Sequence, residues 1–152
     1  MEDFPILFVD DDRQILELVS AYLSRYGFVI ETEISGTAAL EKIEKHDYAI
    51  VFTDLIMPEI SGLDLLKAVK KSGALTEVII VTGYGTIESA IESLKLGGYD
   101  YVQKPINFDR LKILIERIIE KRQLEIENVL IKRRLKDRFS YDQLVGKSPK
   151  MQ

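Results

Sequence analysis

Short apolar runs alternate with amphipathic stretches along the chain, and the alternation repeats five times. In the amphipathic stretches, apolar residues recur three and four positions apart, which is the period of a helix that covers a core. The pattern predicts strands at residues 5–10, 28–33, 48–54, 76–83 and 99–105. It predicts helices within residues 12–27, 35–47, 58–73 and 86–98 and in a long segment from residue 107 onward.

The predicted strands are nearly continuous runs of Val, Ile and Phe, as in "ILFV" and "VIIV". A strand that is apolar at every position is covered on both faces, which is typical of a parallel sheet with helices on each side. The fold class is therefore α/β. We expect a flavodoxin-like, doubly wound, five-stranded parallel sheet in the order 2-1-3-4-5, with a long C-terminal helix.

Polar residues stand where the predicted strands end, and ligands of doubly wound sheets bind at these carboxyl ends. In the expected strand order the first and third strands are neighbours, so Asp11 and Asp54 should meet. The polar residues at the strand ends are Asp10, Asp11 and Asp12 after the first strand, Asp54 after the third, Thr82 after the fourth and Lys104 after the fifth.

Crowded carboxylates raise one another's pKa unless a cation lies between them. Lys104 supplies one positive charge, and a hard divalent cation would neutralise the remainder. Because neither His nor Cys stands at these strand ends, an all-oxygen site favours Mg²⁺, or Mn²⁺ or Ca²⁺, over zinc. A carboxylate beside Mg²⁺ and a lysine can attack phosphorus, and the Thr82 hydroxyl can bind a phosphate oxygen. We interpret Asp54 as the phosphoryl acceptor.

Four stretches together resemble the receiver domains of two-component response regulators. They are "VDDD", "TDLIMPEISGLDLL", "VTGYGT" and "YDYVQKP", within a match that covers about residues 4–121. Each stretch alone is weak, but the combination is specific. "GYGTIESAIESLKLGGYDY" resembles in particular the receivers of sigma-54-dependent transcriptional activators.

The resemblance implies roles for the acidic residues and the loop beside them. Asp54 would be the site of phosphorylation. Asp11 would bind Mg²⁺ directly, Asp10 would act mainly through water, and Ile56 would give its backbone carbonyl to the metal. Gly62, in the loop after the third strand, is expected to need a positive φ.

The resemblance also implies a switch on the last two strands. Thr82 would move toward the phosphoryl group while Tyr101 turns inward, and Lys104 would contact the phosphate. The Lys104–Pro105 bond is usually cis in this family. Tyr84, two residues beyond Thr82, would lie at the rim of the site, where it either modulates hydrolysis or faces a partner.

The last helix is expected to continue to about Arg138, because neither Pro nor Gly occurs between residues 107 and 141. Its distal part carries apolar residues at heptad spacing with one Asn among them, a pattern that favours a two-stranded coiled coil with a fixed register. The predicted dimerisation linker consists of Leu124, Asn128, Ile131 and Leu135. The alternative is a frayed helical extension.

We predict three segments: a receiver domain at residues 1–121, a helical linker with a short coiled coil at 122–139, and the start of a truncated AAA+ module at 140–152. The last segment reads "FSYDQLVGKSPKMQ" from Phe139 and resembles the opening of the ATPase module in sigma-54-dependent activators. Its "GKS" is not a phosphate-binding loop, because that motif needs Gly at position 141, which is Tyr.

The resemblance predicts a signalling protein rather than a turnover enzyme, one that catalyses only its own phosphorylation and dephosphorylation. Its partners would be a sensor histidine kinase, a second copy that pairs through the fourth-helix and fifth-strand face and the linker, and attached AAA+ and DNA-binding domains. Whether phosphorylation makes or breaks the dimer stays open. The alternatives are a stand-alone phosphorelay carrier and a phosphatase of the haloacid dehalogenase class, against which Gln14 argues.

Composition and charge limit where this protein can act and what it can bind. The chain has no Cys, which excludes disulfides and fits a cytoplasmic protein, and no apolar run is long enough to cross a membrane. Residues 110–138 hold ten Lys or Arg against five Asp or Glu, in a chain whose net charge is −4. We interpret this basic arm as a solvated helix face and predict no direct binding of nucleic acid by it.

Overall fold

The computed structural model describes the backbone of residues 4–83 and 87–145. Five strands and five helices alternate along these residues, as the sequence pattern predicts. The strands are β1 (Ile6–Val9), β2 (Ile30–Glu33), β3 (Ile50–Asp54), β4 (Glu77–Thr82) and β5 (Asp100–Gln103). The helices are α1 (Arg13–Ser24), α2 (Gly36–Lys45), α3 (Gly62–Ser72), α4 (Ile87–Lys95) and α5 (Phe108–Val145).

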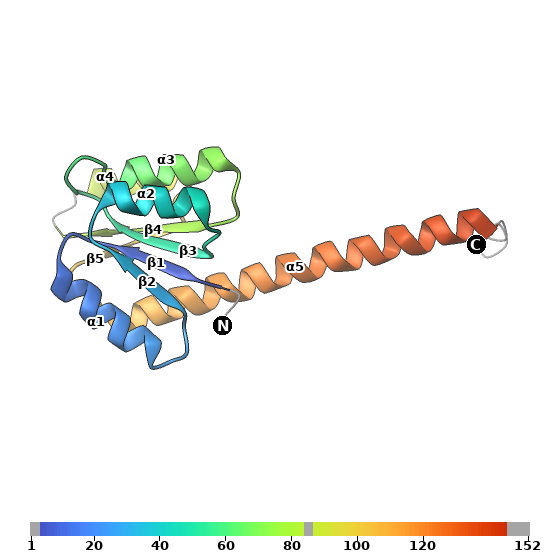
Figure 1. Ribbon diagram of the computed structural model, residues 1–152, viewed down its shortest axis with the longest axis horizontal. Helices are drawn as coiled ribbons and strands as arrows, with labels where there is room; N and C mark the ends of the chain where they lie inside the picture. The colour runs from blue at the N-terminus through green and yellow to red at the C-terminus, as the bar shows by residue number, and fades with distance from the viewer. Residues whose placement is uncertain (1–3, 84–86, 146–152) are drawn as a thin grey trace. The chain divides into compact units, whose positions relative to one another are not determined.

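All five strands are parallel, and the sheet order β2-β1-β3-β4-β5 is the order expected. Helices α2, α3 and α4 lie on one face of the sheet, and α1 and the first part of α5 lie on the other (Figure 1). The fold is therefore the doubly wound one. Because the strands run the same way, their carboxyl ends meet along one edge of the sheet.

The central strands are buried on both faces, and their side chains alternate between two cores. On one face, Leu7, Val51 and Ile80 pack with Leu65 and Leu66 of α3. On the opposite face, Phe8 and Phe52 stack with their ring centroids 5.2 Å apart. This double burial explains why the strands are apolar at nearly every position.

Local sequence signals set the helix starts. Asp12 caps α1, since its carboxylate accepts from the Gln14 backbone N–H at 3.0 Å. Ser35 caps α2 in the same way. Ser61 and Asp64 form a reciprocal capping box at the start of α3.

Helix α5 is longer than expected, since it begins at Phe108 and continues past Arg138 to Val145. The chain divides within it into two compact units, with the boundary between Ile118 and Ile119. In the first unit, α5 buries Leu111, Leu114 and Ile115. Among the described residues, no helix combines the length and the apolar character that crossing a bilayer requires.

Candidate functional site

Three aspartates meet at the carboxyl ends of β1 and β3. Asp10 and Asp11 follow β1, and Asp54 is the last residue of β3. One carboxylate oxygen from each lies within 4.8 Å of the others. Asp10 is fully buried and Asp54 is 9% exposed, whereas Asp11 faces solvent. The structure thus brings together the acidic residues that the sequence predicted to meet.

Lys104 reaches this cluster from the end of β5. Its Nζ lies 3.0 Å from Asp54 Oδ2, to which it donates a hydrogen bond, and 2.9 Å from Asp10 Oδ2. Its backbone N–H donates to the Thr82 carbonyl at 2.8 Å, which holds the ends of β4 and β5 together. The Lys104–Pro105 bond is cis, as the resemblance implied.

The charges of the site are incompletely balanced. Burial raises the pKa of Asp10 above its ordinary value and outweighs the lowering effects of Lys104 and of the Asp12 N–H. Burial by itself lowers the pKa of Lys104, but its contacts with Asp10 and Asp54 outweigh this and raise it. The ammonium group therefore stays charged, while Asp10 remains a costly buried carboxylate.

The donor set fits a hard divalent cation. Asp10 Oδ2 is buried and lacks a hydrogen-bond partner among the described residues, although Lys104 Nζ forms an ion pair with it at 2.9 Å. Two further carboxylates lie beside it, and an all-oxygen set of this kind is what Mg²⁺ prefers. The cluster therefore has acceptor capacity that Lys104 leaves unused.

We expect Asp10→Asn to stabilise the protein in EDTA by about 1 kcal/mol, or roughly 3 °C in melting temperature. The amide removes the buried charge but keeps an oxygen for the Asp12 N–H, which lies 2.9 Å from Asp10 Oδ1. Excess Mg²⁺ should raise the melting temperature of the parent chain more than that of the variant. A variant that melts lower than the parent in EDTA would show that the Lys104 ion pair outweighs desolvation.

Thr82 and Tyr101, the expected switch pair, occupy β4 and β5. Thr82 is the last residue of β4 and is 3% exposed. Tyr101 is half-buried and packs against the core on the α3 face. Thr82 lies at the carboxyl end of β4, whereas Tyr101 lies within β5, where it pairs with Ile80 of β4. Their switching roles remain predictions.

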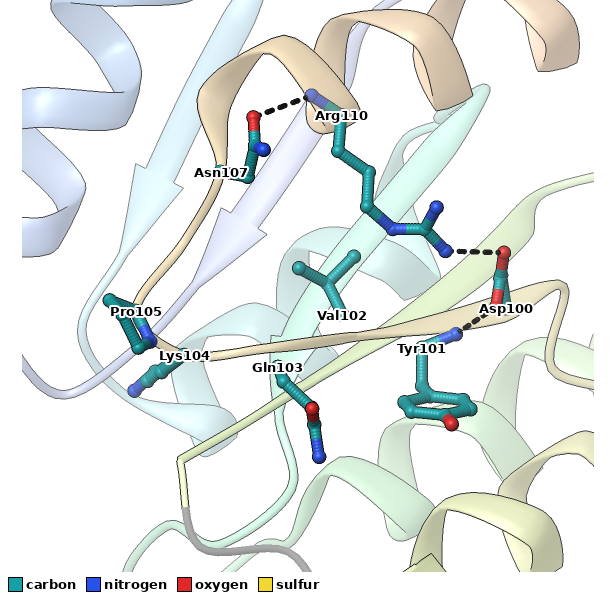
Figure 2. A pocket seen from close by; sticks show the side chains of 8 residues that line it. All are labelled: Asp100, Tyr101, Val102, Gln103, Lys104, Pro105, Asn107 and Arg110. Atoms are coloured by element: carbon teal, nitrogen blue, oxygen red, sulfur yellow. Dashed lines mark hydrogen bonds and ion pairs between the residues drawn. The ribbon is translucent and has the colours of Figure 1, made fainter.

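A hollow of about 500 Å³ runs along β5 and the start of α5. Figure 2 shows the Asp100 carboxylate between two donors: it accepts from the Tyr101 backbone N–H at 2.7 Å and from the Arg110 guanidinium at 3.2 Å. The Asn107 side chain in turn accepts from the Arg110 backbone N–H at 3.1 Å. These contacts tie the backbone of Tyr101 to the first turn of α5.

The loop after β3 contacts Asp54 through Ile56, and one of the predictions made for this loop is wrong. The Ile56 N–H donates to Asp54 Oδ1 at 3.3 Å, and its side chain is 71% exposed. The prediction that Gly62 needs a positive φ is wrong, since the residue with positive φ in this loop is Glu59, at 67°. Gly62 is required by space instead, because a Cβ there would lie 2.4 Å from the backbone carbonyl oxygen of Asp54.

The sequence did not predict the side-chain contact of Glu59, the loop residue that has a positive φ. The hydroxyl of Thr37, at the start of α2, donates to the Glu59 carboxylate at 3.1 Å. Positive φ is unfavourable for a residue with a Cβ. No local pattern signals a bond between residues on different elements, so it could not have been predicted.

The expected linker residues lie in the second unit, with Leu124 54%, Ile131 51% and Leu135 62% exposed. Asn128 is exposed beside them. Tyr84 and residues 146–152 of the expected AAA+ segment fall outside the described residues, as do the side chains of residues 139–145.

Residues 6–116 match the family model described as the response regulator receiver domain. An NtrX-like response regulator of Rickettsia felis is 37% identical over 148 residues, which are 96% of this chain and 30% of that protein. The transcriptional regulatory protein ZraR of Escherichia coli is 32% identical over 99% of this chain and 33% of its own length. The chain thus spans about a third of the length of these relatives.

Solved structures agree with this assignment. The receiver domain of NtrX from Brucella abortus superposes with a TM-score of 0.70 at 35% identity, covering 76% of this chain and 98% of that one. A longer NtrX structure from the same organism, in complex with ADP, gives a TM-score of 0.74 at 34% identity over 82% of this chain and 29% of that one.

Proposed function

The chain belongs to the response regulator receiver domain family, and on that premise we propose that Asp54 accepts a phosphoryl group from a sensor histidine kinase, with Mg²⁺ bound beside it. The observation that carries the proposal is the position of Lys104. Its ammonium group contacts Asp54 and Asp10 at once, beside an acidic cluster that retains unused acceptor capacity. A structural ion pair alone would not need the second and third carboxylates.

Asp11, Asp54 and the Ile56 carbonyl would hold the metal directly, and Asp10 would hold it through water. Bound Mg²⁺ supplies positive charge that offsets the charge on the transferring phosphoryl oxygens. An Asp54 carboxylate oxygen attacks phosphorus in line, and the bond from phosphorus to the donor imidazole nitrogen breaks with its electron pair left on nitrogen. Lys104 then pairs with a phosphoryl oxygen, and the Thr82 hydroxyl donates to another.

The kinase would dock on an apolar hollow of about 280 Å³ beside Lys104. Leu18 of α1 is 51% exposed there. The hollow is lined by Ile15, Leu18, Lys104, Pro105, Ile106 and Phe108. An exposed apolar surface next to a reactive side chain suits a partner that must bring its own reacting group close to Asp54. We place this reaction in the cytoplasm.

Phosphorylation would then shift the population of two states of the Thr82 and Tyr101 pair. The output would be a change in pairing between two copies, through the α4 and β5 face and the linker residues Leu124, Asn128, Ile131 and Leu135. Ile91 and Leu94 of α4, which are 44% and 39% exposed, support such a face. The exposed linker residues support the second contact.

We further propose that the receiver controls an attached AAA+ ATPase and a DNA-binding domain of a sigma-54-dependent activator. The support is that the relatives are regulators about three times as long as this chain, one of them named as a transcriptional regulator. These longer relatives favour this reading over the stand-alone carrier.

Incubation with acetyl phosphate and Mg²⁺ tests the first step. We expect intact mass spectrometry to show a gain of one phosphoryl group, about 80 Da, which is absent when EDTA replaces Mg²⁺. Acetyl phosphate avoids the need to know the kinase. A phosphoryl gain of equal extent in EDTA would overturn the metal requirement, and no gain under either condition would overturn the proposal.

A further inference from the structure

The loop after β3, residues 55–61, is held at both ends by backbone hydrogen bonds. The Leu55 N–H donates to the Val81 carbonyl of β4 at 3.1 Å, and the Gly62 N–H donates to the Leu55 carbonyl at 3.0 Å. Between these points lies Ile56, whose backbone carbonyl is the proposed metal ligand. Fixing the middle of a loop costs conformational entropy, so a further contact is needed to keep that carbonyl in one position.

Glu59 adopts an unfavourable backbone conformation in the middle of this loop. Its φ is 67°, and the Ile60 N–H donates to the Pro58 carbonyl at 2.7 Å across it. A hydrogen bond from residue i+2 to residue i around a positive φ is a γ-turn of the rare, strained kind. A residue with a Cβ keeps such a torsion only where the surrounding structure imposes it, and strain of this kind gathers at functional sites.

Helix α2 supplies a contact to this strained residue. The Thr37 hydroxyl donates to Glu59 Oε2 at 3.1 Å, and this pair is here called the Thr37–Glu59 clasp. The Glu59 carboxylate thus lies beside the first turn of α2, which contains no acidic residue of its own. Since a helix N-terminus favours negative charge, the helix dipole stabilises the carboxylate in the same place.

The backbone of α2 also lies directly against the loop. A Cβ on Gly36 would lie 2.7 Å from the backbone carbonyl oxygen of Ile60. Met57 is 8% exposed and belongs to the same core cluster as Ala39 of α2. The clasp therefore adds a polar contact to a place where helix and loop are already packed closely.

Two conformationally restricted residues, Met57 and Pro58, connect the clasp to Ile56. The Pro58 ring fixes its own φ and restricts Met57, the residue before it, to extended conformations. A displacement of Glu59 is therefore transmitted to the Ile56 peptide rather than absorbed on the way. The Ile56 N–H in turn donates to Asp54 Oδ1 at 3.3 Å, so the same peptide contacts the acidic cluster.

Resting on the proposed function, in which Mg²⁺ binds beside Asp54, we propose that Thr37 and Glu59 are positioning residues for the metal site. Neither side chain is a metal ligand. The clasp holds the loop so that the Ile56 carbonyl is in place before the metal arrives, which removes part of the ordering cost of binding. Loss of the clasp should weaken Mg²⁺ binding and leave phosphoryl transfer at saturating Mg²⁺ nearly unchanged.

Removing the Thr37 hydroxyl tests the clasp with little change of shape. We expect Thr37→Val to raise the Mg²⁺ dissociation constant about fivefold, measured by NMR titration of the metal-free full chain. Thr37→Ser keeps the hydroxyl and should return the constant to within about twofold of the parent. Thr32→Val, the same change on β2, is the matched control and should bind Mg²⁺ like the parent. Parental affinity in Thr37→Val, or an equal loss in Thr32→Val, would overturn the proposal.

A measurement without metal separates positioning of the loop from support of α2. In EDTA, the NMR order parameters of the Ile56 and Glu59 amides should fall in Thr37→Val. The Ala38 amide, which donates to Ser35 Oγ at 3.3 Å in the first turn of α2, should keep its parental value. If the Ala38 amide loosens and the loop amides do not, the hydroxyl serves the start of the helix and the proposal fails.

Glu59→Gly separates metal affinity from stability. Glycine removes the torsional strain together with the contact, so this variant should melt within about 2 °C of the parent in EDTA. Without the carboxylate it should bind Mg²⁺ about fivefold more weakly. A purely structural role of Glu59 predicts a clearly lower melting temperature together with weaker binding. Either that joint loss or parental Mg²⁺ affinity would contradict the positioning role.

Phosphoryl uptake from acetyl phosphate, followed by intact mass, distinguishes failure of this proposal from failure of the proposed function. In Thr37→Val the Mg²⁺ concentration for half-maximal rate should rise about fivefold, while the maximal rate stays within about twofold of the parent. If the parent is phosphorylated and Thr37→Val shows the same Mg²⁺ dependence, the positioning proposal fails alone. If the parent binds Mg²⁺ but takes up no phosphoryl group, the proposed function fails, and the Mg²⁺ titration alone decides the role of the clasp.

Discussion

Replacing Asp54 with Asn is expected to abolish uptake of a phosphoryl group from acetyl phosphate, with a loss of about a thousandfold or more in rate. The amide has nearly the same shape and can still occupy the end of β3, but its oxygen is neutral and is a poor nucleophile. Because Lys104 keeps its contact with Asp10, the site should remain folded. The defect would therefore be chemical rather than structural.

Intact mass spectrometry measures the loss of phosphoryl uptake, and thermal melting measures whether the variant stays folded. Asp137→Asn, the same chemical change on the exposed helical linker, serves as the control and should take up one phosphoryl group like the parent. If Asp54→Asn gains a phosphoryl group at the parental rate, the acceptor is another residue, and the role proposed for Asp54 is wrong.

Replacing Gly62 with Ala should give the largest loss of stability, about 3 kcal/mol in the free energy of unfolding. The added Cβ would lie 2.4 Å from the Asp54 carbonyl oxygen and 3.1 Å from the Leu55 Cα, so it meets backbone rather than a movable side chain. The Gly62 N–H donates to the Leu55 carbonyl at 3.0 Å, which holds the two segments at this separation. Relief of the clash would have to displace the end of β3, which carries Asp54.

Urea unfolding measures the loss of stability in Gly62→Ala and in the control variant Gly83→Ala. Among the residues that the structure describes, a Cβ at Gly83 would meet only the Lys104 Cδ, at the ordinary contact distance of 3.5 Å. This control should therefore change stability by less than about 1 kcal/mol. Similar losses in the two variants would mean that the cost is the general one of replacing a glycine and that close approach at Gly62 is not decisive.

Local sequence pattern accounts for the elements and for much of the site. The apolar strands were visible because residues such as Val51 and Ile80 are buried on both faces, which leaves no polar position in the run. Asp10 and Asp54 were found because the carboxyl ends of parallel strands share one edge. The cap at Asp12 was also predictable, since a side-chain oxygen and a nearby N–H decide it locally.

The ends of helices and the backbone conformations of loop residues were harder to predict from the sequence. Helix α5 extends to Val145 although its end was expected near Arg138, since neither Pro nor Gly in that stretch interrupts it. The expectation of positive φ at Gly62 failed for a related reason. A glycine can be required by torsion or by space, and the sequence does not say which; here Glu59 takes the unfavourable torsion and Gly62 the close approach.

By itself, then, the sequence determined the alternating elements, the acidic strand ends and the apolar heptad pattern of the linker, all of which depend on residue spacing along one segment. Only the tertiary structure decided that Lys104 contacts Asp10 and Asp54 together and that Thr37 binds Glu59. It also decided that one Asp10 oxygen finds no hydrogen-bond partner in the part of the chain that the structure describes. Those contacts join residues far apart in the chain, and their distances follow from strand register and helix packing, which no local pattern encodes.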